Sequence, residues 1–334
     1  MKTPVFFLIF NLLFASPVFA KIRLVEWHTS SALAPIILPV REGETPEQAS
    51  QRYINNLEKS PDLMELFEGK TPTFETVGYR ELNDSQREQR ALLVANLPKD
   101  TTKSSLRIEK LNLYLKQKEH LPFILPINSN LGLTIGETRE LFDLISKKFP
   151  FMIGLGGDDI DPRLYDKENF HSRNVIPERD RFEISLIKSY VTSARGFYMG
   201  ICRSSQLAAV ALGYELIQDI PFNFPKNIGH DNSWHDVQLK PTTHSILKMS
   251  SSNGQTLNVY NYHHQAVIFK PGGFLELAAV SSDGITKATE FSDGRGILMQ
   301  FHPELMDNNQ GYRILSQIIN VKTQTMTRSC SRIF

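Results

Sequence analysis

Cysteine, net charge and long apolar runs are all scarce in this chain, and each scarcity excludes a class of protein. Only two cysteines occur in 334 residues, Cys202 and Cys330, so a disulfide-rich scaffold is excluded. The 37 basic and 36 acidic side chains leave a formal net charge of +1, which gives no reason to expect nucleic acid as a partner. After residue 20, no apolar run approaches the roughly 20 residues that a membrane span needs. The composition is otherwise that of a soluble globular protein.

Recognisable metal-binding patterns are also missing. Asp158, Asp159 and Asp161 lack the spacing of a calcium loop, and we interpret them as turn residues. No histidine pair has the spacing of a zinc protease, and no cysteine cluster accompanies the histidines of the second half, which are His230, His235, His263 and His264. The sequence therefore predicts no metal site.

The N-terminus has the pattern of a secretory signal peptide. A basic start is followed by the apolar run 5–14 and by Pro17-Val18-Phe19-Ala20, which suits cleavage after Ala20. We therefore expect residues 1–20 to be removed from an exported protein, periplasmic or secreted, with no membrane span left. A buried strand or helix is the alternative interpretation.

Hydrophobic periodicity divides the rest of the chain into two parts. In residues 21–103, the segment 22–27 predicts a strand, and 46–57 and 84–95 have helical composition. In the more regular part, 104–322, helices are expected at 104–118, 134–148, 178–194, 206–212 and 310–321. Strands are expected there at 122–127, 149–155, 197–201, 237–239, 257–262, 275–280, 285–291 and 296–301. This alternation predicts an α/β fold whose sheet is mainly parallel, with antiparallel strands added late. Residues 323–334 form a polar tail.

The segment 197–212 is the most informative part of the sequence. A buried strand leads directly to Cys202, and a helix follows at once, which is the pattern of a nucleophile elbow. A helix N-terminus favours the thiolate, the reactive form of cysteine. We expect no structural disulfide, because pairing with Cys330 would block this thiol; a Cys202–Cys330 bond is the alternative.

A candidate base lies about a hundred residues further along the chain. In an extended segment, His302 and Glu304 would point to the same side, so the carboxylate could hold the imidazole in one tautomer. Cys202, His302 and Glu304 are therefore the predicted catalytic residues. Gly156 and Gly157 follow a buried strand and, with the Arg203 N–H, could form an oxyanion hole. The histidine-rich stretch 262–265 is expected to line a substrate site.

Five ordered motifs make the chain similar to a known family. They are Gly154-Leu-Gly-Gly-Asp-Asp-Ile-Asp-Pro162, Arg179-Asp-Arg-Phe-Glu183, Gly200-Ile-Cys-Arg203 with Gln206, Asn261-Tyr-His-His-Gln-Ala-Val267, and Gln300-Phe-His-Pro-Glu304. From about 104 to 320 the chain resembles class I glutamine amidotransferase-like proteins. Within them it resembles the γ-glutamyl hydrolase-like peptidase group C26, which includes γ-glutamyl-γ-aminobutyrate hydrolases.

The resemblance implies a Rossmann- or flavodoxin-like three-layer α/β/α sandwich. It implies Cys202 as nucleophile, His302 as base and then acid, and Glu304 as the orienting carboxylate. A γ-glutamyl amide would be cleaved through a thioester, with no cofactor. Gln206, His263, His264 and Gln265 match positions that hold the glutamyl moiety in relatives. Ser204 departs from the usual glycine, and residues 21–103 match no familiar pattern.

Three functions agree with these observations. The first is an exported hydrolase acting on small γ-glutamyl substrates, which the expected export favours because no synthase domain is expected here and ammonia channelling outside the cytoplasm has no obvious use. The second is a glutaminase or amidotransferase subunit that needs a partner. The third is a non-catalytic binding protein on the same fold. The leaving group, the substrate length and the oligomeric state do not follow from the sequence.

Overall fold

The computed structural model describes residues 21–30, 32–58, 74–95, 102–127, 131–193, 195–306 and 309–331, with side chains left out at 102–105 and 326–331. The predicted signal peptide lies outside these residues. The strands are β1 Ile22–Thr29, β2 Ile36–Arg41, β3 Thr76–Glu81, β4 Arg90–Ala95, β5 Leu121–Pro126, β6 Phe151–Gly154, β7 Phe197–Ile201, β8 Glu215–Ile217, β9 Ser233–Leu239, β10 Thr256–Asn261, β11 Ala266–Ile268, β12 Leu275–Ser281, β13 Thr286–Phe291 and β14 Gly296–Met299. The α-helices are α1 Pro46–Glu58, α3 Thr102–Gln117, α4 Ile135–Lys148, α5 Pro177–Thr192, α6 Arg203–Ala211, α7 Ile220–Asn223 and α8 Asn309–Ser331. None of the helices in these ranges is both long and apolar enough to cross a membrane.

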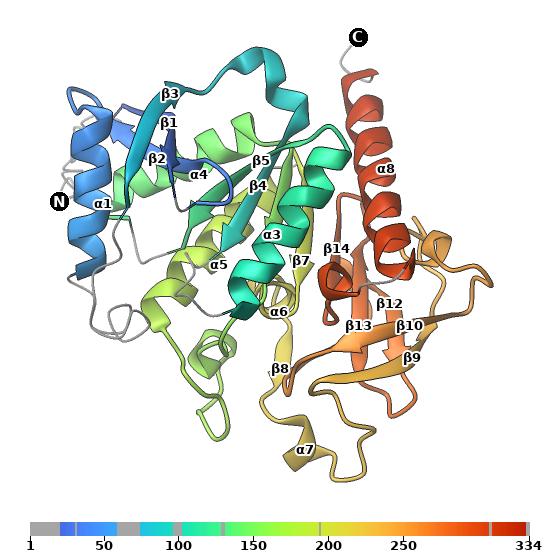
Figure 1. The fold of residues 1–334 in the computed structure, drawn as a ribbon. Helices are drawn as coiled ribbons and strands as arrows, with labels where there is room; N and C mark the ends of the chain where they lie inside the picture. Colours follow the sequence, from blue (N-terminus) through green and yellow to red (C-terminus); the bar gives the residue numbers. More distant parts are fainter. Residues whose placement is uncertain are drawn as a thin grey trace, which may run out of the picture.

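Most of the strands form one large sheet with a parallel centre (Figure 1). Its order is β10-β9-β12-β13-β14-β7-β6-β4-β5-β2-β1-β3. The neighbours from β14 to β2 pair in parallel, whereas β13, β12, β9 and β10 pair antiparallel beyond β14. The central strands are buried along their whole length, as expected for a sheet covered on both faces. The predicted mainly parallel sheet with late antiparallel strands is therefore confirmed.

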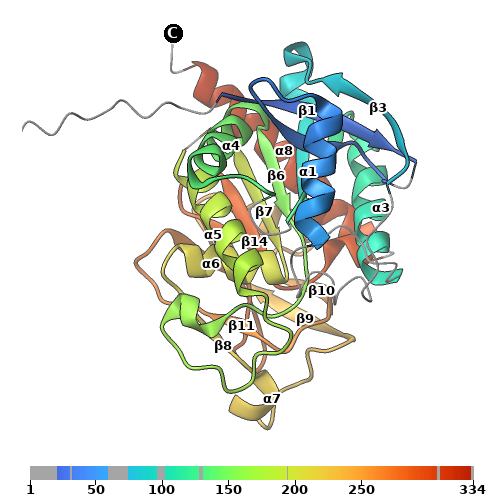
Figure 2. The same cartoon turned by 90° about the vertical axis from the view of Figure 1, so that its left-hand side faces the viewer.

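Helices cover both faces of this sheet and complete the three-layer sandwich. Figure 2 shows α4, α5 and α6 on one side of β6, β7 and β14, with α3 on the other side. Helices α3 and α8 lie over the same face, where Leu115 and Ile318 meet Phe151 of β6 and Met199 of β7. The hydroxyl of Tyr114 on α3 donates to Ser316 Oγ on α8 at 2.9 Å, so the two helices are also joined by a hydrogen bond. The Rossmann- or flavodoxin-like sandwich implied by the resemblance is confirmed.

The prediction of a helix at 84–95 is wrong. Residues Asp84–Gln89 form a 3-10 segment that is kinked at Gln86, and Arg90–Ala95 form β4, which lies in the parallel centre between β5 and β6. The polar residues before position 90 gave the window a helical composition, but the apolar run 91–95 is fully buried and pairs on both sides. This strand directly precedes α3 in the chain. The predicted strand 22–27 lies within β1, in an antiparallel group of β1, β2 and β3 at one edge of the sheet.

Other predicted elements agree with the structure, with shifted ends. Thr134 accepts a hydrogen bond from the Glu137 N–H, and the Glu137 carboxylate accepts from the Thr134 N–H, so the capping box that opens α4 is present. Gly284 and Gly294 have positive φ angles of 87° and 75° in the two turns that flank β13. The last helix, α8, continues to Ser331, well beyond the predicted end at 321. Most of the segment predicted as a polar tail is therefore helical.

Candidate functional site

Cys202 occupies the sharp turn between β7 and α6, at the carboxyl end of the parallel strands. Its backbone has φ 51° and ψ −111°, in a region that costs a non-glycine residue about 1–3 kcal/mol. The turn is held by hydrogen bonds: the Cys202 N–H donates to the Met299 carbonyl at 2.7 Å, and the Cys202 carbonyl accepts from Ser205 N–H at 3.0 Å. The side chain is buried, with 7% exposed. The predicted strand–turn–helix around this cysteine is thus present.

Close packing beneath the turn explains two glycines of the neighbouring strands. A Cβ atom on Gly154 of β6 would lie 2.5 Å from the Ser204 Cβ. A Cβ atom on Gly200 of β7 would lie 3.0 Å from the Ser205 Cα. The contact at Gly154 is shorter than real Cβ contacts and the contact at Gly200 is tighter than most, so glycine at both positions lets the start of α6 cross the strands at this distance.

His302 and Glu304 follow β14, the strand next to β7. His302 Nδ1 donates to Glu304 Oε1 at 2.7 Å, and neither side chain is exposed to solvent. The segment is not extended as expected, because Pro303–Leu305 form a 3-10 turn. It is this turn that brings the carboxylate back to the imidazole. His302 Nε2 is buried and has no hydrogen-bond partner among the described residues.

Electrostatics couple the thiol to the imidazole. Burial raises the pKa of Cys202, but the nearby His302 imidazolium and the Arg107 guanidinium outweigh burial, so its pKa is lowered. Burial lowers the pKa of His302, but the Glu304 carboxylate and the Cys202 thiolate outweigh it and raise this pKa to about 9. Both shifts favour a thiolate–imidazolium pair, in which the sulfur is nucleophilic and the ring can release a proton.

Gly156 and Gly157 lie in the loop after β6, beside these residues. A Cβ atom on Gly156 would lie 3.1 Å from His302 Cε1 and 2.9 Å from Arg107 Nη1. In the part of the chain that the structure describes, the N–H groups of Gly156, Gly157 and Arg203 make no hydrogen bond. Unused N–H groups close to a thiol are what an oxyanion hole requires, and that role stays a prediction.

The Arg203 side chain enters a fully buried ionic cluster between α5 and α6. Its guanidinium donates to Asp180 Oδ1 and to Glu183 Oε2. Ser204 is also fully buried, and its hydroxyl donates to Glu183 Oε1 at 2.8 Å. The serine that departs from the family's usual glycine is therefore accommodated, and its polar atom is paired.

Gln206 links the thiol's surroundings to the segment 263–265. Its Nε2 donates to Gln300 Oε1 at 3.0 Å and to the Gln265 carbonyl at 3.2 Å. Gln300 Nε2 in turn donates to Cys202 Sγ at 3.7 Å. The thiol also contacts the Tyr262 carbonyl, at 3.8 Å. This segment therefore forms a wall of the site.

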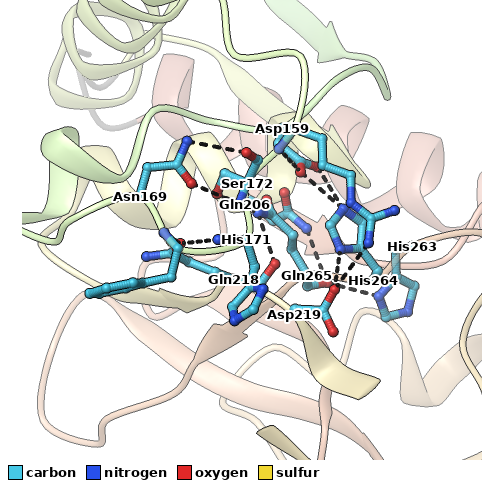
Figure 3. Close-up of polar contacts among 12 residues, drawn as sticks. Asp159, Asn169, His171, Ser172, Gln206, Gln218, Asp219, His263, His264 and Gln265 are labelled. Carbon is cyan, nitrogen blue, oxygen red and sulfur yellow. Dashed lines mark hydrogen bonds and ion pairs between the residues drawn. The ribbon is translucent and has the colours of Figure 1, made fainter. Parts of the chain in front are cut away.

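His264 and Gln265 extend the wall to the surface through a polar network (Figure 3). His264 Nε2 lies 2.9 Å from Asp159 Oδ2 and its Nδ1 lies 3.3 Å from Asp219 Oδ2. Hydrogen bonding to Asp159 raises the pKa of His264 against burial. Gln265 Nε2 donates to Ser172 Oγ at 2.8 Å. The loop 159–172 is thereby fastened to the wall.

Four residues near the site were missed by the sequence reasoning. Arg107 lies 4.0 Å from Glu304, on a helix surface that no motif marked. Asp159 was expected only to shape a turn, whereas it pairs with His264. Gln300 belongs to a family motif but had no predicted role, and it donates to Cys202 Sγ. Lys287 lies in β13, a strand that also contains two threonines and a glutamate, so no apolar pattern marked this lysine as buried. Asp161 does behave as a turn residue, since it caps Pro162–Tyr165.

No cluster of three or more metal-ligating side chains is present within the described ranges. Lys287 Nζ occupies the space between His230 and His263, so an ammonium group lies where the two rings converge.

Fold and site together define a class: an α/β protein with a cysteine at a strained strand–helix turn, beside a histidine paired with a glutamate. A family model described as Peptidase C26 matches residues 114–304, more than half of the chain. The protein therefore belongs to the Peptidase C26 family, which supports a hydrolase or an amidotransferase.

Similar proteins agree with this placement. The chain is 30% identical over 189 residues to the Lactococcus lactis protein named "Putative glutamine amidotransferase-like protein YvdE", covering 55% of this chain and 75% of that protein. It is 34% identical over 152 residues to a Mycobacterium tuberculosis protein named "Putative glutamine amidotransferase Rv2859c", covering 45% of this chain and 48% of the other. Among solved structures, the glutaminase domain of the Trypanosoma brucei protein CTPS, with bound acivicin, has a TM-score of 0.50 at 15% identity. That match covers 70% of this chain and 93% of the other, and it concerns the fold alone.

Proposed function

We propose that this protein is a cysteine hydrolase that cleaves γ-glutamyl amide bonds. The observation that carries the proposal is the juxtaposition at the end of β7 and β14. Cys202 sits at a positive φ of 51°, and His302, hydrogen-bonded to Glu304 at 2.7 Å, keeps Nε2 free of other partners in the described chain. A thiol with a lowered pKa next to an imidazole with a raised pKa supports nucleophilic catalysis.

The proposed reaction has two halves. The Cys202 thiolate attacks the γ-carbonyl carbon, and the oxygen that becomes negative is bound by the N–H groups of Gly156 or Gly157 and Arg203. The C–N bond then breaks, and the amine leaves with the proton from His302. A water molecule, deprotonated by the now neutral His302, attacks the thioester and releases glutamate and the thiol. Glu304 holds the ring orientation throughout.

Gln206, His263, His264 and Gln265 are proposed to hold the γ-glutamyl part of the substrate. Support comes from their place: Gln206 and Gln265 join the wall that the thiol contacts, and His264 lies where this wall reaches the surface. We also propose export, on the N-terminal sequence pattern alone.

The names of the two curated relatives favour a second candidate, a glutaminase or amidotransferase subunit. The two candidates differ in their products. A stand-alone hydrolase releases amines from γ-glutamyl amides by itself, whereas an amidotransferase subunit releases ammonia from glutamine and needs a partner to use it.

The test is amine release from glutamine, γ-glutamyl-γ-aminobutyrate, glutathione and γ-glutamyl peptides, with the wild type beside Cys202→Ala. We expect release by the wild type and none by the variant, with unfolding temperatures that differ little. Release by the variant would overturn the mechanism. Ammonia from glutamine alone would favour the second candidate, and no release from any compound by folded wild type would favour a binding protein.

A further inference from the structure

Lys287 is a lysine buried behind the site. It lies on β13 with 0% of its surface exposed. Its ammonium nitrogen makes three contacts of hydrogen-bond length: 2.7 Å to His230 Nδ1, 2.7 Å to Asn261 Oδ1 and 2.8 Å to His263 Nε2. A buried lysine is costly unless its charge and its donors are satisfied, so three partners point to a specific role.

The other contacts of His230 and His263 determine which ring nitrogens are donors. His230 Nε2 lies 2.9 Å from Asp283 Oδ2, and His263 Nδ1 lies 2.8 Å from the Gln265 carbonyl. Carboxylate and carbonyl oxygens only accept, so these two ring nitrogens carry the protons. The nitrogens facing Lys287 are therefore acceptors. Together with Asn261 Oδ1 they match the three N–H groups of an ammonium and not the two of a neutral amine.

The partners of Lys287 belong to the wall of the site. Asn261 and His263 bracket Tyr262, whose carbonyl is 3.8 Å from Cys202 Sγ. His263 donates to the Gln265 carbonyl, which also accepts from Gln206. A continuous chain of hydrogen bonds thus runs from Asp283 through Lys287 to the groups around the thiol.

We propose that Lys287 is a positioning residue: its ammonium fixes the segment Asn261–Gln265 against Cys202 and adds a buried positive charge near the thiolate, besides those of His302 and Arg107. The effect of Lys287 on substrate binding rests on the proposed γ-glutamyl hydrolysis, whereas its effect on the reactivity of the Cys202 thiol does not.

Burial works against the charge of Lys287 and lowers its pKa far below the usual range, whereas Asp283 and the Cys202 thiolate favour the charged form. The charged form therefore depends on the three acceptors around Nζ. Burial is the largest cause that lowers the pKa of His230 and of His263, and the positive charge of Lys287 is the next. Both rings are therefore kept neutral, so each can accept a hydrogen bond from Lys287. The titratable groups that act on the thiol or on Lys287 are His302, Arg107, Glu304, His230, His235, His263 and Asp283.

The test uses Lys287→Met, which keeps the length of the side chain and removes its charge and donors. Lys322→Met is the matched control, because Lys322, on α8 away from the site, is also buried, at 4% exposed, and donates to the Glu88 carbonyl. All variants carry Cys330→Ser, so Cys202 is the sole thiol. The rate of iodoacetamide alkylation is measured from pH 5 to 10, and KM and kcat are measured on the best γ-glutamyl compound.

We expect Lys287→Met to move the midpoint of the alkylation profile up by about one pH unit and to raise KM about tenfold. Lys322→Met should change neither. Asn261→Ala keeps the charge and removes one link to the wall, so KM should rise while the alkylation midpoint stays; this variant also serves if Lys287→Met does not fold.

An alkylation midpoint and a KM that match those of Lys322→Met would overturn the role of Lys287, as would an unchanged KM in Asn261→Ala. If the wild type hydrolyses no γ-glutamyl compound, the proposed function fails, and the alkylation profiles still decide the effect on the thiol because they need no substrate.

Discussion

Replacing Glu304 by glutamine separates the charge of this residue from its orienting hydrogen bond. Glutamine has the same shape, and its amide oxygen can still accept the proton of His302 Nδ1, 2.7 Å away in the wild type. The ring therefore keeps its tautomer and orientation, while the negative charge disappears from a place where neither side chain touches solvent.

The size of the effect follows from the pKa of His302. In the wild type this pKa is raised from 6.5 to about 9 against burial, with Glu304 the larger of the two charges that raise it. That difference corresponds to about 3 kcal/mol. Without the carboxylate, burial dominates and the pKa of His302 should fall by about 2 units or more. The imidazolium is then lost near neutral pH, so the pKa of Cys202 rises.

The assay is the pH dependence of iodoacetamide alkylation of Cys202. In the wild type the thiolate–imidazolium pair persists until the pH rises through about 9 and His302 loses its proton. In Glu304→Gln the alkylation rate at pH 7 should fall about tenfold. Glu137→Gln is the control: this carboxylate also pairs with an arginine, Arg41 at 2.6 Å, but on α4. A Glu304→Gln profile that coincides with that of Glu137→Gln would refute the coupling of Glu304 to the thiol through His302.

Three further predictions concern the surroundings of the thiol. Ser204→Ala removes the hydroxyl that donates to Glu183 at 2.8 Å, so the free energy of unfolding in urea should fall by about 1–3 kcal/mol. The control is Ser185→Ala, on the exposed side of α5. A smaller loss of stability in Ser204→Ala than in this control would contradict the prediction. Gly156→Ala places a Cβ atom 3.1 Å from His302 Cε1, so hydrolysis should drop at least tenfold while circular dichroism stays that of the wild type; full activity would mean that the loop has room for a side chain. The pKa of His264 is raised from 6.5 by hydrogen bonds to carboxylates, so its contribution to stability is fully present below pH 6.5 and is lost as the pH rises through the folded-state pKa. The stability difference between wild type and His264→Gln should therefore shrink with rising pH, and a difference that grows would contradict this sign.

Strands and helices with clear periodicity could be predicted, whereas segments of mixed character could not. The run 197–201 and the capping box at Thr134 are local signals, and the structure has both elements. Strand β4 was not predicted because the window 84–95 joins a polar 3-10 segment to an apolar strand. The average composition of that window resembles the composition of a helix. The antiparallel pairing of β1 with β3 depends on contacts between segments far apart in the sequence, which no local pattern encodes.

The candidate site shows the same division. Cys202, His302 and Glu304 could be predicted because the chemistry of a nucleophile and its base constrains both residue type and spacing. The pairing of His302 with Glu304 was reached for the wrong local reason, since a 3-10 turn and not an extended strand brings them together. Arg107 and Lys287 approach the site from α3 and β13 only after the sheet is assembled, so their roles depend on tertiary contacts.

The adjacency of β7 and β14 in the sheet also has a consequence for the order of folding. Cys202 and His302 are about a hundred residues apart in the sequence, and the Cys202 N–H is bonded to Met299 of the later strand. Such a contact forms late, because a long loop must close first. During synthesis from the N-terminus, the thiol is made long before its base. The growing chain therefore carries a cysteine without the imidazolium that lowers its pKa, and the reactive thiolate arises only when the last parallel strand joins the sheet.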